Sequence, residues 1–129
     1  MISYLITIIV MIMLHIIADY NIQGWLAQSK QKKYWTDLFP NMNKIDDPTH
    51  KYINDYKMCL AMHSFSWAFC IMLPIFIHKV NLLTIIIFAL NIVIHYYVDD
   101  LKANELKINL VEDQLFHIAQ IIITALLIL

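Results

Sequence analysis

Residues 91–102 read NIVIHYYVDDLK, and this stretch leads from an apolar run, through a histidine and two aspartates, into polar sequence. His95 and Asp99 are four residues apart, a spacing that places two side chains on one face of a helix with β-carbons about 5–6 Å apart. The same spacing occurs at two other places, at His15 and Asp19 and, in reverse order, at Asp113 and His117. This repetition predicts helices whose polar ends meet at one level.

The chain is more apolar than an ordinary soluble domain. Its 129 residues are 60% hydrophobic and include a single glycine, and the mean hydropathy is +0.63. A net charge of -1 and the absence of arginine leave no basic surface for phosphates or bases. We therefore predict one integral membrane domain over residues 1–129 that does not bind nucleic acid.

Four apolar runs are close to the roughly 20 residues that a membrane-spanning helix requires. The predicted spans cover residues 2–20, 56–77, 81–99 and 113–129, joined on one side by connections over residues 21–55 and 100–112. Trp25, Tyr34 and Trp35 near the start of the longer connection predict a short helix at the level of the lipid headgroups. The expected fold is an all-α, integral membrane four-helix bundle with an interfacial helix and loop between its first two spans.

The lysines predict the orientation of this bundle. The two long connections hold seven of the nine lysines, whereas the opposite side holds only Lys79. Because positively charged connections stay in the cytoplasm, we expect both connections inside and both termini outside. Lysine as the sole strong base, beside many isoleucines and asparagines, is typical of AT-rich bacterial and phage genomes. We expect a multi-pass protein of a bacterial inner membrane.

Topology and spacing together place one histidine from each span at one depth. At a rise of 1.5 Å per residue, all four histidines lie roughly 7–10 Å inside the cytoplasmic boundary. An ionised aspartate costs about 2.5–3.5 kcal/mol at the centre of a spanning helix, so each aspartate should face a partner inside the bundle. The predicted metal ligands are His15, Asp19, His63, His95, Asp99, Asp113 and His117.

Imidazole and carboxylate donors suit a divalent metal, most of all Zn²⁺, with Mn²⁺ or Fe²⁺ as alternatives. Seven donors exceed one tetrahedral shell, so the set would suit one or two ions. Other polar residues follow the same helical period and could support the ligands or contact a substrate: Gln23, Lys30, Asn91, Lys102, Gln114 and Gln120. The amides could orient imidazoles or instead link helices by hydrogen bonds, and the lysines could meet an anionic headgroup or phosphate.

Four blocks follow one another along the chain: HIIADYNIQ (15–23) with Lys30, then His63, HYYVDDLK (95–102) and DQLFHIAQ (113–120). In these blocks the chain resembles a family of small phage and bacterial membrane proteins known as domain of unknown function 3307. Residues 34–56 look like an extension of the shorter members, and Gly24 stands where a hydroxyl residue is more usual. The resemblance implies a fold and a site rather than an activity. A looser similarity is to membrane-bound metal-dependent hydrolases.

The leading functional hypothesis is a metal-dependent hydrolase that opens toward the cytoplasmic leaflet. A bound Zn²⁺ ion would lower the pKa of its water to about 7, and Asp19, Asp99 or Asp113 would act as general base. The substrate would be a lipid or a small phosphorylated molecule.

The alternatives are non-enzymatic. One is a protein that moves protons or metal ions through the same cluster. Another is a phage-encoded factor that binds a host membrane protein and holds a structural metal. A homo-oligomer is compatible with each of these hypotheses.

Overall fold

The computed structural model describes residues 2–38 and 54–129, and every regular element in these ranges is helical. The elements are α1 (Ile2–Ile16), the π-helical turn η1 (Ile17–Asn21), α2 (Leu26–Ser29), α3 (Lys32–Leu38), α4 (Asp55–Phe76), α5 (Leu82–Ala103) and α6 (Leu110–Ile128). The prediction of an all-α four-helix bundle is confirmed. The part of the predicted connection that covers residues 39–53 lies outside the described residues.

Four helices are long and apolar enough to cross a membrane: Ser3–Asn21, Asp55–Phe76, Leu82–Ala103 and Leu110–Ile128. Two of them extend several residues into the polar connection predicted over residues 100–112: α5 continues to Ala103 and α6 begins at Leu110. The reason at one end is Asn109, whose side chain accepts hydrogen bonds from the backbone N–H groups of Val111 and Glu112 and so starts α6 early.

Burial follows the pattern expected when hydrocarbon rather than water surrounds a bundle. Among the described residues, fourteen apolar and fourteen polar or charged side chains are buried. Large apolar side chains such as Leu5, Phe65 and Ile123 are exposed on the outer faces of the long helices. Because a water-soluble domain would expose the polar set instead, the distribution agrees with four membrane spans.

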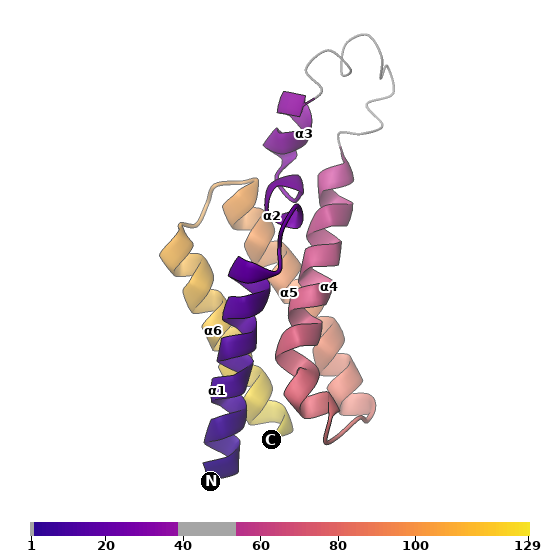
Figure 1. Ribbon diagram of the computed structural model, residues 1–129, viewed down its shortest axis with the longest axis vertical. Helices are drawn as coiled ribbons and strands as arrows, with labels where there is room; N and C mark the ends of the chain where they lie inside the picture. The colour runs from indigo at the N-terminus through magenta and orange to yellow at the C-terminus, as the bar shows by residue number, and fades with distance from the viewer. Residues whose placement is uncertain (1, 39–53) are drawn as a thin grey trace.

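The four long helices run side by side, and both termini lie at the same end of the bundle (Figure 1). Near this end, the hydroxyl of Tyr4 donates to the carbonyl oxygen of Ala125 at 3.0 Å and links α1 to α6. The apolar core includes Ile71, Ile75 and Ile121, which are at most 1% exposed. We call this part of the molecule the packed half.

The short helices α2 and α3 lie at the opposite end of the bundle (Figure 1). Gly24, at a φ of +50°, allows the turn that leads from η1 into α2, because a side chain is strained in this left-handed conformation. The side chain of Asn104 then holds the segment on α5, donating to the carbonyl oxygen of Lys30 at 3.2 Å and accepting from the backbone N–H of Lys32 at 2.7 Å. As a result, α2 lies against the polar ends of the long helices.

Candidate metal centre

Three histidines from three different helices line up within the bundle. Nε2 of His95 on α5 lies 3.1 Å from Nε2 of His63 on α4, and its Nδ1 lies 3.2 Å from Nδ1 of His117 on α6. All three side chains are at most 2% exposed. The i,i+4 spacing on α5 and α6 turns each histidine toward the bundle interior one turn below an aspartate. The fold therefore brings these three predicted ligands together.

Three aspartates surround this row of imidazoles. Nε2 of His63 lies 3.3 Å from Oδ1 of Asp19 and 3.2 Å from Oδ2 of Asp99. Nε2 of His117 lies 3.3 Å from Oδ1 of Asp99 and 3.3 Å from Oδ1 of Asp113. We call these three histidines and three aspartates the His/Asp cluster. Its members come from η1 and from the three other long helices, so the cluster exists only in the folded bundle.

Two lysines neutralise part of the negative charge. Nζ of Lys30 lies 2.5 Å from Oδ2 of Asp99, and both side chains are almost fully buried. Nζ of Lys102 lies 2.7 Å from Oδ2 of Asp113, and its side chain is 33% exposed. The sequence predicts that both lysines support the ligands or contact a substrate. In the structure they pair with cluster carboxylates, at the edge that faces α2.

His15, another predicted metal ligand, lies next to the cluster and is hydrogen-bonded to residues outside it. Its Nδ1 accepts a hydrogen bond of 2.8 Å from the indole N–H of Trp67, so a neutral ring carries its proton on Nε2, which lies 3.0 Å from Oε1 of Gln114. Both ring nitrogens are therefore engaged. The spacing from His15 to Asp19 runs into the π-helical turn η1, where the α-helical stacking of residues four apart does not hold.

Gln114 connects His15 to the cluster by hydrogen bonds. Its Nε2 donates to Oδ2 of Asp19 at 3.1 Å and to Oδ2 of Asp113 at 3.0 Å. Gln23 adds a donor to Asp19, with Nε2 2.9 Å from Oδ1. Hydrogen bonds thus fix both carboxylates, and their Oδ1 atoms face the histidines. The supporting position predicted for Gln114 and Gln23 agrees with this arrangement.

Asn91 and Gln120 do not orient imidazoles. Nε2 of Gln120 donates to the backbone oxygen and to Oδ1 of Asn91, at 2.9 and 2.8 Å, and Nδ2 of Asn91 donates to the hydroxyl of Thr124 at 2.9 Å. The two amides lie one helical turn deeper than His95 and His117, on facing helices, and reach each other more easily than the rings. They link α5 to α6, which was the other interpretation of the sequence.

The donors of the His/Asp cluster fit a divalent cation. Three overlapping groups each bring three ligand atoms within 4.8 Å of one another: Asp19, His63 and His95; His95, Asp99 and His117; and Asp19, Asp113 and His117. Two ligands bound to Zn²⁺ at 2.0–2.1 Å and a tetrahedral angle would lie about 3.4 Å apart. The histidine–carboxylate separations of 3.2 and 3.3 Å are close to this value.

Two buried atoms of the cluster lack hydrogen-bond partners. Nε2 of His117 and Oδ1 of Asp113 are 3.3 Å apart, at ion-pair distance, yet neither makes a hydrogen bond among the described residues. Buried polar atoms are normally satisfied, and a shared cation is one way to satisfy a ring nitrogen and a carboxylate oxygen together.

A cavity of about 330 Å³ adjoins the cluster on the side of α2. Cluster residues Asp19 and Asp99 form part of its wall, together with Lys30 and Lys102. Tyr20 and Leu106 lie at its exposed rim. A small polar group could therefore reach two of the carboxylates from the end of the bundle that carries α2 and α3.

Sequence reasoning missed Trp67, the largest fully buried side chain. Its indole stacks on the ring of His95, with centroids 4.1 Å apart, and donates to His15. The signal was present, because Trp67 follows His63 by four residues on α4 and so faces the same side. Asn104 was missed as well, and it is one turn beyond Asp100, to which it donates a hydrogen bond of 2.7 Å.

Comparison with protein-family models, curated proteins and solved structures finds no match to this chain. The resemblance to domain of unknown function 3307 therefore stays a prediction. The class that the fold supports is a membrane protein with four spanning helices.

Proposed function

We propose that this chain is a membrane-embedded, metal-dependent hydrolase whose His/Asp cluster holds one or two divalent cations, most suitably Zn²⁺. The observation that carries the proposal is the convergence of three imidazoles and three carboxylates from different helices, with His117 Nε2 and Asp113 Oδ1 buried 3.3 Å apart without a hydrogen bond. Ionisable side chains inside a membrane cost free energy, and a cluster of them usually marks a functional site.

The charges support a cation at this place. Lys30 and Lys102 balance two of the three carboxylates. One negative charge remains when the histidines are neutral, and neutral histidine is the form that binds metals. A divalent cation together with one hydroxide would bring the total to neutrality.

The chain's own residues divide into holding and reacting groups. The three histidines, together with Asp99 and Asp113, would hold the cation or cations. A bound cation would supply Lewis acidity and a water that ionises near neutral pH. Asp19 faces both the cluster and the cavity, so it is placed to accept a proton from a molecule in the cavity.

The cavity indicates a substrate with an anionic group, either a lipid phosphoester or a small phosphorylated molecule. Lys102 lies in its wall with a third of its side chain exposed, so its ammonium group could meet such an anion. We place this end of the bundle at the cytoplasmic leaflet of a bacterial inner membrane, and both termini outside. The lysines support this orientation, since seven of the nine lie in the two predicted connections, 21–55 and 100–112.

A second function is favoured by the row of imidazoles. The ring nitrogens of His63, His95 and His117 are within 3.2 Å of their neighbours, as in a chain that passes protons. One protonated histidine would balance the remaining negative charge without a metal. A non-enzymatic protein that moves protons or metal ions is therefore the alternative.

The test is hydrolysis by the purified full chain in mixed micelles with Zn²⁺, Mn²⁺ or Fe²⁺ added. The substrates are a p-nitrophenyl phosphodiester and an anionic phospholipid. We expect metal-dependent hydrolysis that Asp99→Asn lowers by about a hundredfold or more. The matched control is Asp100→Asn, the same change one residue away, which should keep the rate.

The proposal fails if no metal supports hydrolysis or if both variants react alike. Proton flux into vesicles that is lost in His95→Ala, without any hydrolysis by the wild type, would establish the alternative instead.

A further inference from the structure

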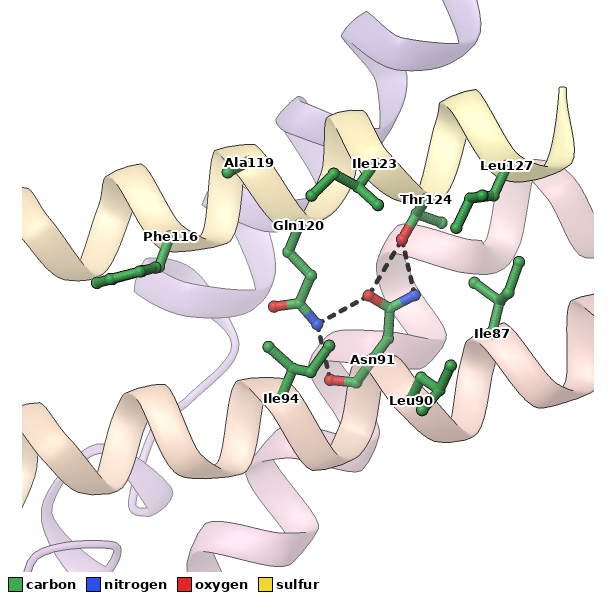
Figure 2. A pocket seen from close by; sticks show the side chains of 10 residues that line it. All are labelled: Ile87, Leu90, Asn91, Ile94, Phe116, Ala119, Gln120, Ile123, Thr124 and Leu127. Atoms are coloured by element: carbon green, nitrogen blue, oxygen red, sulfur yellow. Dashed lines mark hydrogen bonds between the residues drawn. The ribbon is translucent and has the colours of Figure 1, made fainter.

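A hollow of about 280 Å³ lies between α5 and α6 on the membrane-facing side of the packed half. Figure 2 shows the side chains that line it, seven apolar and three polar. The apolar ones are Ile87, Leu90, Ile94, Phe116, Ala119, Ile123 and Leu127. The polar ones are Asn91, Gln120 and Thr124, one to two turns deeper than the His/Asp cluster. We call this hollow the α5–α6 groove.

One acceptor in the groove has no partner. Oε1 of Gln120 is buried and makes no hydrogen bond among the described residues, and the residue as a whole is only 6% exposed. Figure 2 shows this oxygen on the side of the amide that faces away from Asn91, toward the part of the groove between Phe116 and Ile94. A carboxamide oxygen in such surroundings requires a hydrogen-bond donor.

The direction of this oxygen is fixed by its surroundings. Nε2 of Gln120 lies 2.9 Å from the backbone oxygen of Asn91 and 2.8 Å from Oδ1 of the same residue. Both of these atoms accept hydrogen bonds, so only the NH₂ end of Gln120 can face them. A flipped amide would set three acceptors against one another. The Oε1 atom therefore must face the groove.

The missing donor should come from a molecule that dissolves in the membrane. Gln120 lies near the middle of α6, and exposed apolar residues such as Leu90 and Phe116 flank the groove. Water is scarce at this depth of a bilayer. A second copy that packed the same face against this one would offer no good donor, since Gln120 Nε2 and the Thr124 hydroxyl already donate to Asn91.

The volume of the groove favours a hydrocarbon chain over a helix as its occupant. One turn of a helix about 10 Å wide and 5.4 Å long fills about 420 Å³, more than the groove contains. An unbranched hydrocarbon chain fits along α6 between Phe116 and Leu127, which lie at opposite ends of the hollow in Figure 2. We propose that the α5–α6 groove binds a hydrocarbon chain that carries a hydroxyl group, and that this hydroxyl donates to Oε1 of Gln120. This proposal is independent of the hydrolase.

The experiment uses the full-length protein in detergent. The probe is dodecanol that carries a photoactivatable diazirine on its hydrocarbon chain. Labelled residues are mapped by peptide mass spectrometry, with unlabelled dodecanol or dodecane as competitor. We expect labels on groove residues of α5 and α6, and dodecanol should compete about fivefold better than dodecane, the ratio for one ordinary hydrogen bond.

The variant Gln120→Met keeps the length of the side chain and removes the acceptor. It should label with no preference for the alcohol over the alkane. The proposal is overturned if the label spreads equally over the outer faces of α1 and α4, if the alkane competes as well as the alcohol, or if Gln120→Met keeps the preference. The competition in the wild type decides the matter even if the variant does not fold.

Discussion

The two halves of the bundle are built from the same four helices but are held together differently. In the packed half, Ile71, Ile75 and Ile121 fill the space between helices with apolar contacts. In the other half, which we call the site half, the His/Asp cluster and two lysines occupy the same position in the cross-section. The packed half can thus supply stability that the buried charges of the site half do not supply.

This difference has an energetic basis. Apolar packing in the interior is favourable whatever the state of the site, whereas buried charges are costly unless each has a partner. Loss of a partner should therefore destabilise the site half strongly. A ligand that supplies one should stabilise the whole chain, because it binds only the folded state.

Trp67 belongs to both halves, so its replacement should have the largest effect. Trp67→Ala would open a cavity in the core, remove the ring under His95 and leave His15 without its donor. We expect a loss of about 3–5 kcal/mol in the free energy of unfolding in detergent. Trp67→Phe, which keeps an aromatic ring but loses the donor, should cost clearly less. A loss below about 1 kcal/mol for Trp67→Ala would contradict a shared core.

The two lysines sharpen the contrast between buried and exposed charge. Lys30→Met would leave Asp99 buried without its 2.5 Å partner, at a cost of about 3 kcal/mol in metal-free protein. Lys102→Met should cost about 1 kcal/mol, because Lys102 is partly exposed and Asp113 keeps its donor from Gln114. Thermal unfolding of both variants beside the wild type checks this order. Equal losses would show that burial does not decide the strength of the pairs.

The smallest effect is expected where polar residues link helices within the packed half. Thr124→Val removes the hydroxyl that bonds to Asn91 and should cost about 0.6 kcal/mol, the average for hydrogen bonds between membrane helices. Ser66→Ala is the control, since the Ser66 hydroxyl bonds only within its own helix, to the carbonyl oxygen of Met62. Unfolding by detergent titration measures both. A loss above about 2 kcal/mol for Thr124→Val would show that these hydrogen bonds between α5 and α6 contribute as much stability as a pair of buried charges.

The helices and the level of the cluster could be predicted from the sequence for simple reasons. Hydrophobic runs of sufficient length locate the spans, and a spacing of four residues locates His95 below Asp99 and His117 below Asp113. Both signals lie within single segments, so they can be recognised without knowing which helices pack together.

Pairings between helices could not be predicted in this way. The partner of His15 depends on how far α1 rotates relative to α4, and the π-helical turn η1 changes the register just before Asp19. For Asn91 and Gln120, the choice between an imidazole and each other depends on the distance between α5 and α6. The pairing of Lys30 with Asp99 depends on the turn at Gly24 that folds α2 back. These are properties of packing, which one sequence does not display.

The most direct test of the central claim is the metal content of the full chain, purified in mild detergent without chelators. Elemental analysis would compare the wild type with His63→Ala and His95→Ala, and with His78→Ala as the matched control. His78 lies in the exposed turn after α4. We predict one or two equivalents of zinc, manganese or iron in the wild type and in His78→Ala, and loss of the metal in the other two variants. No metal in the wild type, or equal metal in all four proteins, would contradict a metal centre in the His/Asp cluster.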